Sequence, residues 1–309
     1  MRNAFAECVT SIAKKNKKIV LLSGDIGNRL FNNFRKNFND RFYNCGIAEA
    51  NMTSLASGLS ASGLKPITYT IASFNTLRCL EQIRLDVCYP NRPVIIVGTG
   101  AGLSYANLGS THHTVEDIGI LKNFPNLQIL CPSDASETKL ALNEAIKSNR
   151  PTYIRLGKKG EPDLKLKNKF KIGKNHTIVK GKKKDFVIIT YGTVTSEVIK
   201  SLNLLNKKNI YPTVIKVDTI APLNIKKIIN QIRTFKNIFI IEEHLEISGL
   251  GSQLAQFILK NKIKINNFKI FGLPTLFLSS CGNQMQAREK YGISSKKIFK
   301  KIILSNKIK

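Results

Sequence analysis

Residues 66–98, PITYTIASFNTLRCLEQIRLDVCYPNRPVIIVG, contain two short apolar runs on either side of a longer stretch with helical character. The runs PITYTI at 66–71 and PVIIVG at 93–98 are rich in Ile, Val and Thr, which is typical of buried strands. Residues 74–88 between them predict a helix. A strand, a helix and a second strand in this order predict an α/β fold.

The same alternation continues along the whole chain of 309 residues. Before and after the central stretch we expect strands at 18–22, 127–130 and 152–155, and helices at 2–14, 48–61, 115–122 and 134–148. The alternation resumes after a Lys-, Gly- and Asn-rich segment, with strands at 186–190, 211–217, 238–242 and 267–271 and helices at 195–206, 250–261 and from Ser294 or Ser295 onward. The pattern predicts two α/β domains, each a mainly parallel sheet flanked by helices, at 1–160 and 185–309, joined by a surface linker at 161–184.

The chain is strongly basic, with 49 Lys and Arg against 20 Asp and Glu and a formal net charge of +29. Such charge could bind nucleic acid or an anionic membrane. Alternatively, it could attract phosphorylated substrates or an acidic partner protein. The lysine runs at 14–18, 182–184 and 300–301 are dispersed and are not interleaved with aromatic residues, as a nucleic-acid module would require. We therefore favour diffuse charge and do not expect specific nucleic-acid binding.

The cysteines and the apolar segments argue against secretion and membrane insertion. The six cysteines form no CxxC pair and have no zinc-type spacing with His, so we expect reduced thiols and no metal site. The N-terminal residues lack the pattern of a secretory leader, and no segment reaches the roughly 20 apolar residues that span a bilayer. We expect a cytoplasmic protein.

Glu49, in CGIAEANM at 45–52, is a carboxylate among small and apolar residues. Alone it could be a first-turn acid that is stabilised by the helix dipole. However, a strand-like segment ends just before Gly46, so Glu49 falls in the crevice where α/β proteins bind ligands. The small residues at 54–61 indicate close packing against another helix, across a subunit interface.

Two longer segments carry a resemblance to a known family. FYNCGIAEANMTSLASGLSASGLKPITYTIASFNTLRCLEQIR at 42–84 and GSTHHTVEDIGILKNFPNLQILCPSD at 109–134 resemble the pyrimidine-binding domain of transketolases. IEEHLEISGLGSQLAQFI at 241–258 is similar to their C-terminal domain, and the resemblance covers essentially the whole chain. The Gly-Asp-Gly…Asn motif of the family's remaining domain is not present. The resemblance therefore implies the C-terminal subunit of a split transketolase, which works with an N-terminal partner subunit, in an α2β2 assembly.

The resemblance implies thiamine diphosphate as cofactor, with Mg2+ or a similar divalent metal held by the partner. Glu49 would hydrogen-bond a pyrimidine nitrogen, and we expect its burial to favour the protonated carboxyl. Phe74 would pack on the pyrimidine face, beside Ile71, and Asp25 would lie near the cofactor and the interface. Taken alone, Phe74 could be an ordinary core residue and Asp25 an ordinary turn residue.

The Gly-rich loop GTGAGLSYANLGSTHH at 98–113 lacks the Lys-Ser/Thr of a phosphate-binding P-loop. The resemblance implies that His112 contacts the donor sugar and helps to move protons, with His113 as a weaker candidate. Leu108 stands where the family has an Asp that reads donor hydroxyls, and Gly100 stands where it has a phosphate-binding His. We therefore expect a substrate other than a standard pentose phosphate.

Arg2, Lys158 and Arg29 fall where the family binds substrate phosphate, although each could also be a solvated surface charge. The consecutive Glu242, Glu243 and His244 do not share one face of a strand, which argues against a metal site there.

The predicted activity is transfer of a two-carbon ketol unit from a ketose to an aldose. Alternatives are the beta subunit of a 2-oxo-acid dehydrogenase, one half of a deoxyxylulose-phosphate synthase, and a non-catalytic basic scaffold subunit.

Overall fold

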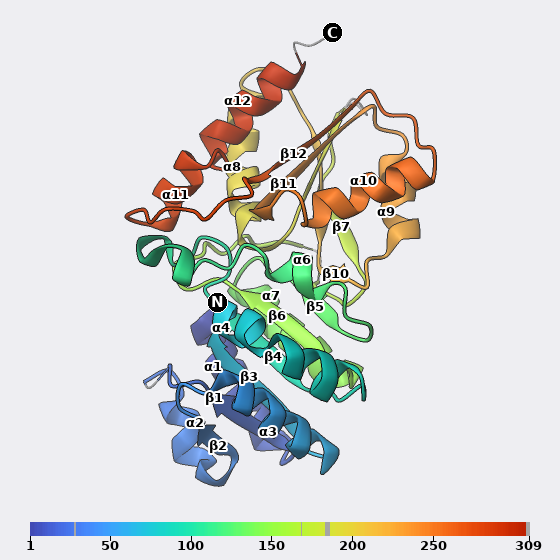
Figure 1. Cartoon of the computed structure of the whole chain (residues 1–309). Helices are drawn as coiled ribbons and strands as arrows, with labels where there is room; N and C mark the ends of the chain where they lie inside the picture. The colour runs from blue at the N-terminus through green and yellow to red at the C-terminus, as the bar shows by residue number, and fades with distance from the viewer. Residues whose placement is uncertain (28, 168, 183–185, 307–309) are drawn as a thin grey trace.

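The computed structural model describes residues 1–27, 29–167, 169–182 and 186–306. Two sheets lie end to end along the molecule (Figure 1). Apart from β10, the strands of the first sheet are drawn in blue to green, and those of the second are drawn in yellow-green to orange. The N-terminus lies near the junction of the two halves, and α12 (Ser295–Asn306) extends to the far end of the second (Figure 1). The predicted α/β architecture with two mainly parallel sheets is confirmed.

The first sheet has seven strands in the order β10-β5-β6-β4-β3-β1-β2. All neighbours pair in parallel except β10, which runs antiparallel to β5. The strands are β1 (Ile19–Ser23), β2 (Phe42–Asn44), β3 (Lys65–Ile71), β4 (Ile95–Thr99), β5 (Gln128–Leu130), β6 (Thr152–Leu156) and β10 (Thr219–Ala221). Since β10 comes from the second half of the chain, the two halves share this sheet.

Helices cover both faces of the first sheet, because each has one apolar face to bury. On one face α1 and α7 pack together, and α3 covers the other face. Outside residues 72–88, the helices of this half are α1 (Arg2–Lys15), α2 (Asn32–Asn37), α3 (Glu49–Ala61), α6 (Asp117–Leu121) and α7 (Ala135–Ser148), with short 3-10 turns η1 (Asn39–Arg41) and η4 (Ala106–Thr111).

The single helix predicted at 74–88 is wrong in detail. It is divided into α4 (Ala72–Thr76), η2 (Leu77–Cys79), α5 (Leu80–Gln82) and a π-helical turn, η3 (Ile83–Cys88). Two polar side chains explain the first break. The buried Asn75 amide donates to Val97 O on β4 (3.0 Å), and Thr76 Oγ1 donates to Ala72 O (2.6 Å). Such bonds compete with regular helix geometry, and Thr76 leaves the helical region at φ −122°, ψ −70°.

The second sheet has five strands in the order β12-β11-β8-β9-β7, and only β7 is antiparallel to its neighbour. Helices α8 and α12 cover one face, and α9 and α10 cover the other. The elements are β7 (Asn175–Val179), β8 (Phe186–Thr190), η5 (Gly192–Val194), α8 (Thr195–Asn206), β9 (Thr213–Val217), α9 (Ile225–Ile232), β11 (Asn237–Leu245), α10 (Leu250–Lys260), β12 (Asn267–Leu273), α11 (Gln284–Lys290) and α12 (Ser295–Asn306).

The segment 161–184 differs from the surface linker that its composition predicts. It contains β7, and Phe170, which is only 3% exposed, belongs to the apolar core beneath the first sheet. The high Lys and Gly content of this segment therefore does not reveal that β7 and Phe170 are packed into the folded structure. Residues 168, 183, 184 and 185 of the predicted linker and second domain lie outside the described residues.

All six cysteines are free thiols, four of them buried, as expected. Within the described ranges, no helix has both the length and the apolar character that crossing a bilayer requires.

Candidate active site

Glu49 is the first residue of α3, and its side chain is only 1% exposed. The carboxylate lies at the helix N-terminus, where the dipole and the free N–H groups stabilise negative charge. Gly24 lies directly behind it, and a Cβ at this glycine would come within 3.2 Å of Glu49 Cγ. The predicted burial of a single carboxylate at this point is thus present in the structure.

Arg78 is a site residue that sequence reasoning missed. Its Nη1 donates to Glu49 Oε2 at 2.7 Å, and its guanidinium lies 4.3 Å from the centre of the Phe74 ring. From the sequence we expected a protonated Glu49 and did not predict this contact with a guanidinium. The signal was available, since Phe74 and Arg78 are four residues apart in FNTLRC.

Three aromatic rings meet next to this pair. The His112 ring centre lies 5.2 Å from that of Phe74 and 5.8 Å from that of Tyr105. His112 is half-buried, and its Nδ1 lies 2.9 Å from Thr111 Oγ1. Burial, together with the charge of Lys158, lowers the pKa of His112, so its imidazole is neutral at neutral pH.

Two predicted phosphate-binding cations, Arg2 and Lys158, border the same aromatic cluster. Lys158 Nζ lies 4.2 Å from the centre of the Tyr105 ring. Burial and then the charges of Lys159 and Arg2 lower the pKa of Lys158, which shows that the cations lie close enough to repel one another. Arg2 Nε is buried and has no hydrogen-bond partner in the described part of the chain. An anion bound here would relieve both the repulsion and the unpaired donor.

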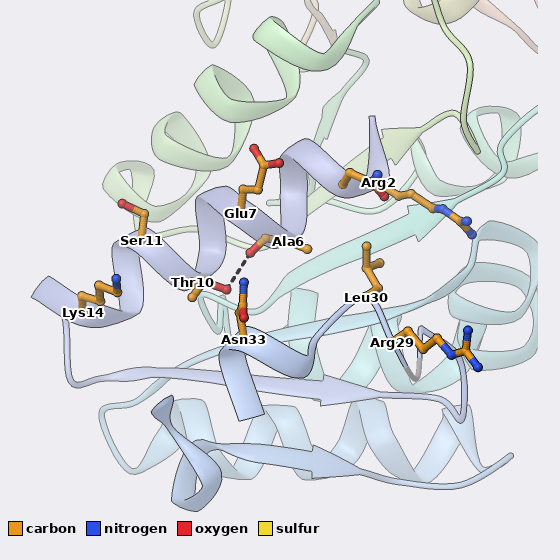
Figure 2. A pocket seen from close by; sticks show the side chains of 10 residues that line it. Arg2, Ala6, Glu7, Thr10, Ser11, Lys14, Arg29, Leu30 and Asn33 are labelled. Atoms are coloured by element: carbon orange, nitrogen blue, oxygen red, sulfur yellow. Dashed lines mark hydrogen bonds between the residues drawn. The ribbon is translucent and has the colours of Figure 1, made fainter. Parts of the chain in front are cut away.

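A groove of about 570 Å³ runs along α1 beside the start of α2. In Figure 2, Arg2 and Arg29 extend toward the same end of this groove, and Lys14 lies at the other end. Arg29 is exposed, so the structure brings it near Arg2 without burying it.

Asp25 lies in a turn, and Ile71 lies at the end of a strand. Asp25 is an exposed turn residue with φ +51°, and its Oδ1 accepts a hydrogen bond from Asn44 Nδ2 (3.0 Å). Ile71, the last residue of β3, is 8% exposed and directly precedes α4, the helix that carries Phe74.

Gly100 and Leu108, the two departures from the family pattern, have different surroundings. Gly100 has φ +78°, and a Cβ there would overlap the Tyr105 ring. Tyr105 thus fills the space that a side chain at position 100 would need. Leu108 lies in η4 and is 44% exposed.

His113 is more deeply buried than its neighbour His112. It is 4% exposed, and neither ring nitrogen makes a hydrogen bond of normal geometry with the described residues. Burial lowers its pKa, and the carboxylate of Glu243 acts in the opposite direction. His113 is thus buried within the same loop as His112, close enough to Glu243 for the charge of that carboxylate to act on it.

Glu242, Glu243 and His244 bind three different groups. Glu242 Oε2 accepts from Leu250 N, Glu243 Oε1 accepts from Leu103 N, and His244 Nε2 accepts from Gly119 N. Among the residues that the structure describes, no group of three or more His, Cys, Asp or Glu side chains could hold a metal ion.

Comparison with protein families decides the assignment. Residues 1–161 match the transketolase pyrimidine-binding domain, and residues 175–298 match the transketolase C-terminal domain. The chain belongs to the transketolase family. The predicted resemblance is thereby confirmed, and the site described above lies within the pyrimidine-binding part of a transketolase-family fold.

Individual transketolase-family relatives agree with this assignment. The chain is 29% identical to an apulose-4-phosphate transketolase subunit of Phocaeicola vulgatus, over 97% of this chain and 95% of that protein. It is 34% identical to 1-deoxy-D-xylulose-5-phosphate synthase of Dictyoglomus turgidum, over 87% of this chain but only 43% of that protein. A solved structure described as a split gene transketolase, inactive beta4 tetramer, superposes with a TM-score of 0.86 at 29% identity, over 98% of this chain and 97% of the other.

Proposed function

We propose that this chain is the pyrimidine-binding and C-terminal subunit of a split, thiamine-diphosphate-dependent transketolase. It would transfer a two-carbon ketol unit from a ketose to an aldose. The observation that carries the proposal is the buried carboxylate of Glu49 at the start of α3, which Arg78 connects to the neighbouring rings of Phe74 and His112. Relatives of similar length that are named as transketolase subunits support it.

The residues present fit the aminopyrimidine of this cofactor. A flat ring with polar nitrogens needs an aromatic or apolar surface and a group that can share a proton, which Phe74, Ile71 and Glu49 can supply. Asp25 would lie at the edge of the site. When bound, thiamine diphosphate supplies the nucleophilic carbon and the electron sink for ketol transfer.

Each side chain then has a defined task. Glu49 holds one proton against the pyrimidine, and Arg78 balances the carboxylate charge when that proton is absent. The neutral imidazole of His112 donates or accepts a hydrogen bond at a sugar oxygen. Arg2 and Lys158, with Arg29 nearby, hold an anionic group of the substrate. His113, which is buried in the same loop, remains a weaker candidate for contact with the substrate.

We propose that the substrates are sugar phosphates other than the standard pentose phosphates. The cations favour a phosphate, whereas Gly100 and Leu108 lack the polar groups that the family pattern has there. The name of the Phocaeicola relative makes apulose 4-phosphate a first compound to test.

The partner in this proposal is an N-terminal subunit that supplies the ligands of the diphosphate and of Mg2+, in an α2β2 complex of the cytoplasm. The free thiols of all six cysteines support a reducing compartment.

The deciding experiment is purification of the tagged chain from its native cells at moderate salt, followed by identification of bound proteins and cofactor. A stoichiometric partner with thiamine diphosphate and a divalent metal, and ketol transfer by the complex, would establish the proposal. A partner bearing lipoyl groups would instead indicate a 2-oxo-acid dehydrogenase. Recovery of the chain alone, or with nucleic acid that resists salt, would favour a basic scaffold subunit.

The second candidate is one half of a deoxyxylulose-phosphate synthase, favoured by the 34% identity to the Dictyoglomus enzyme. The same complex distinguishes the two by its product, because only a synthase of this kind would form 1-deoxy-D-xylulose 5-phosphate.

A further inference from the structure

The loop that carries Tyr105, His112 and His113 lies between the two halves of the molecule (Figure 1). We call residues 100–114 the His112 loop. Its two ends are paired, since Gly102 N donates to Thr114 O (2.8 Å) and Thr114 N donates to Gly102 O (3.0 Å). The rest of the loop includes the irregular turns of η4, with Gly109 in a non-helical conformation. Such a segment depends on contacts from outside for a single shape.

Glu243 of β11 makes the most buried of these contacts. Its Oε1 accepts from Leu103 N (2.7 Å) and from Gln284 Nε2 (2.8 Å), and its Oε2 accepts from Arg288 Nε (2.5 Å). The glutamate is 2% exposed, so these three donors satisfy its charge in place of water.

Gly102 shows how closely the carboxylate approaches the loop. This residue has φ +64°, and a Cβ there would overlap Glu243 Oε1. The loop backbone and the carboxylate are thus fitted to each other, and a side chain at position 102 would separate them.

Other groups of the second half hold the loop along its length. Cys281 N donates to Ala106 O (2.7 Å), and Ser110 Oγ donates to Leu278 O (2.8 Å). Gln284 Nε2, besides its bond to Glu243, lies 3.2 Å from Ser104 Oγ.

The neighbouring Glu242 has no such role. Its Oε2 accepts from Leu250 N (2.8 Å) and from the hydroxyl of Tyr191 (3.0 Å), and its Oε1 accepts from Gly251 N (3.2 Å). All of these partners belong to the second half of the chain. Side chains alternate between the two faces of a strand. The adjacent Glu242 and Glu243 therefore point to opposite faces, and only Glu243 reaches the His112 loop.

We propose that Glu243 is a positioning residue that reaches from the C-terminal domain to fix the His112 loop in the shape that presents His112 and Tyr105 to the substrate. The catalytic consequence rests on the proposed ketol transfer, whereas the ordering of the loop does not. The C-terminal domain then contributes to the site without touching the substrate. In contrast, Glu49, Phe74 and Arg78 lie on elements that Glu243 does not contact.

The test compares Glu243→Gln with the matched Glu242→Gln in the full-length chain, by hydrogen–deuterium exchange. Gln cannot accept from all three donors of Glu243, so we expect exchange at Leu103 and the adjoining amides to become about tenfold faster or more. Glu242→Gln should leave exchange of residues 100–114 within about twofold of the unchanged chain. If Glu243→Gln does not fold, Gln284→Ala provides the same test, because Gln284 is partly exposed and also donates to Glu243. We expect a smaller increase in the exchange rate at residues 103–104 in this variant.

In the complex with the partner subunit, Glu243→Gln should lower kcat/KM about tenfold and leave thiamine diphosphate affinity within about twofold. A general loss of structure would weaken both. Unchanged loop exchange in both Glu243→Gln and Gln284→Ala, or equal loosening in Glu242→Gln, would overturn the proposal. If the loop loosens as expected but the unchanged complex transfers no ketol group, the ordering role stands and the proposed function fails.

Discussion

The ion pair between Glu49 and Arg78 gives a prediction that needs neither partner nor cofactor. Glu49 is 1% exposed, whereas the Arg78 side chain is 44% exposed, and the two charged atoms are 2.7 Å apart. At an effective dielectric constant of about 20, the Coulomb attraction over that distance is about 6 kcal/mol, but desolvation of the carboxylate offsets most of it. Because water reaches Arg78, we expect a net coupling of about 1.5–3 kcal/mol.

The two single substitutions should differ. Arg78→Ala leaves a buried carboxylate without its cation and should lower the free energy of unfolding by about 1.5–3 kcal/mol. Glu49→Gln removes the buried charge and leaves a guanidinium that can turn to water, so it should cost about 1 kcal/mol or less. The order of the two losses is therefore a sharper test than either value.

The assay is urea unfolding of the full-length chain and of the two single and one double variants, followed by circular dichroism. Arg84→Ala is the matched control, because Arg84 pairs with Glu81 at 3.1 Å on the same helical segment with both side chains more than half exposed. It should change stability by about 0.5 kcal/mol or less. A coupling below about 0.5 kcal/mol, or a greater loss for Glu49→Gln than for Arg78→Ala, would refute the reasoning.

Four further predictions concern other buried or half-buried groups. In the complex with the partner subunit, Glu49→Ala should abolish ketol transfer and leave assembly intact by size-exclusion chromatography; full activity would make its assignment wrong. Because the pKa of His112 is lowered from 6.5, the acid limb of kcat/KM should lie below pH 6.5 and should disappear in His112→Asn, and a limb at higher pH would contradict this. Burial raises the pKa of Glu242 to about 7, so its contribution to stability is present at low pH and is lost as pH rises through 7. When the pH is raised from 5 to 8, the urea concentration at the unfolding midpoint should therefore fall by more in the unchanged chain than in Glu242→Gln. Asp117→Asn should lower the free energy of unfolding by about 3–5 kcal/mol, because the buried Arg155, 2.8 Å from Asp117, then lacks a counter-charge. The double variant Asp117→Asn with Arg155→Leu should lose less stability than Asp117→Asn alone.

Sequence reasoning predicted those parts of the fold whose signal is local. The apolar β-branched runs at 66–71 and 93–98 became β3 and β4, and the small residues around Glu49 correctly indicated its burial. The helix at 74–88 was wrong in detail, because its first break depends on a hydrogen bond from Asn75 to a neighbouring strand, which the periodicity of the sequence does not reveal. The three-residue strand β10 has no pattern of its own and forms only because β5 offers an edge.

The candidate site was predicted less completely. Family resemblance supplied Glu49, Phe74 and His112, which the structure brings together. It did not supply Arg78, although the spacing from Phe74 was a local signal, and it did not supply Glu243, which is defined by its contact partners rather than by its own neighbours. Leu103, the loop partner of Glu243, is 140 residues away in the sequence, so no local sequence pattern could reveal this contact.

The strand β10 also constrains how this chain can be divided or recombined. A cut or a fusion point near residue 180, where composition suggests a boundary, would separate β5 from Thr219 and Ala221, its antiparallel neighbours. The first fragment would then have a bare sheet edge with unpaired backbone groups, which invites aggregation. A fragment of residues 1–180 should therefore aggregate at concentrations at which the full-length chain remains dispersed in solution.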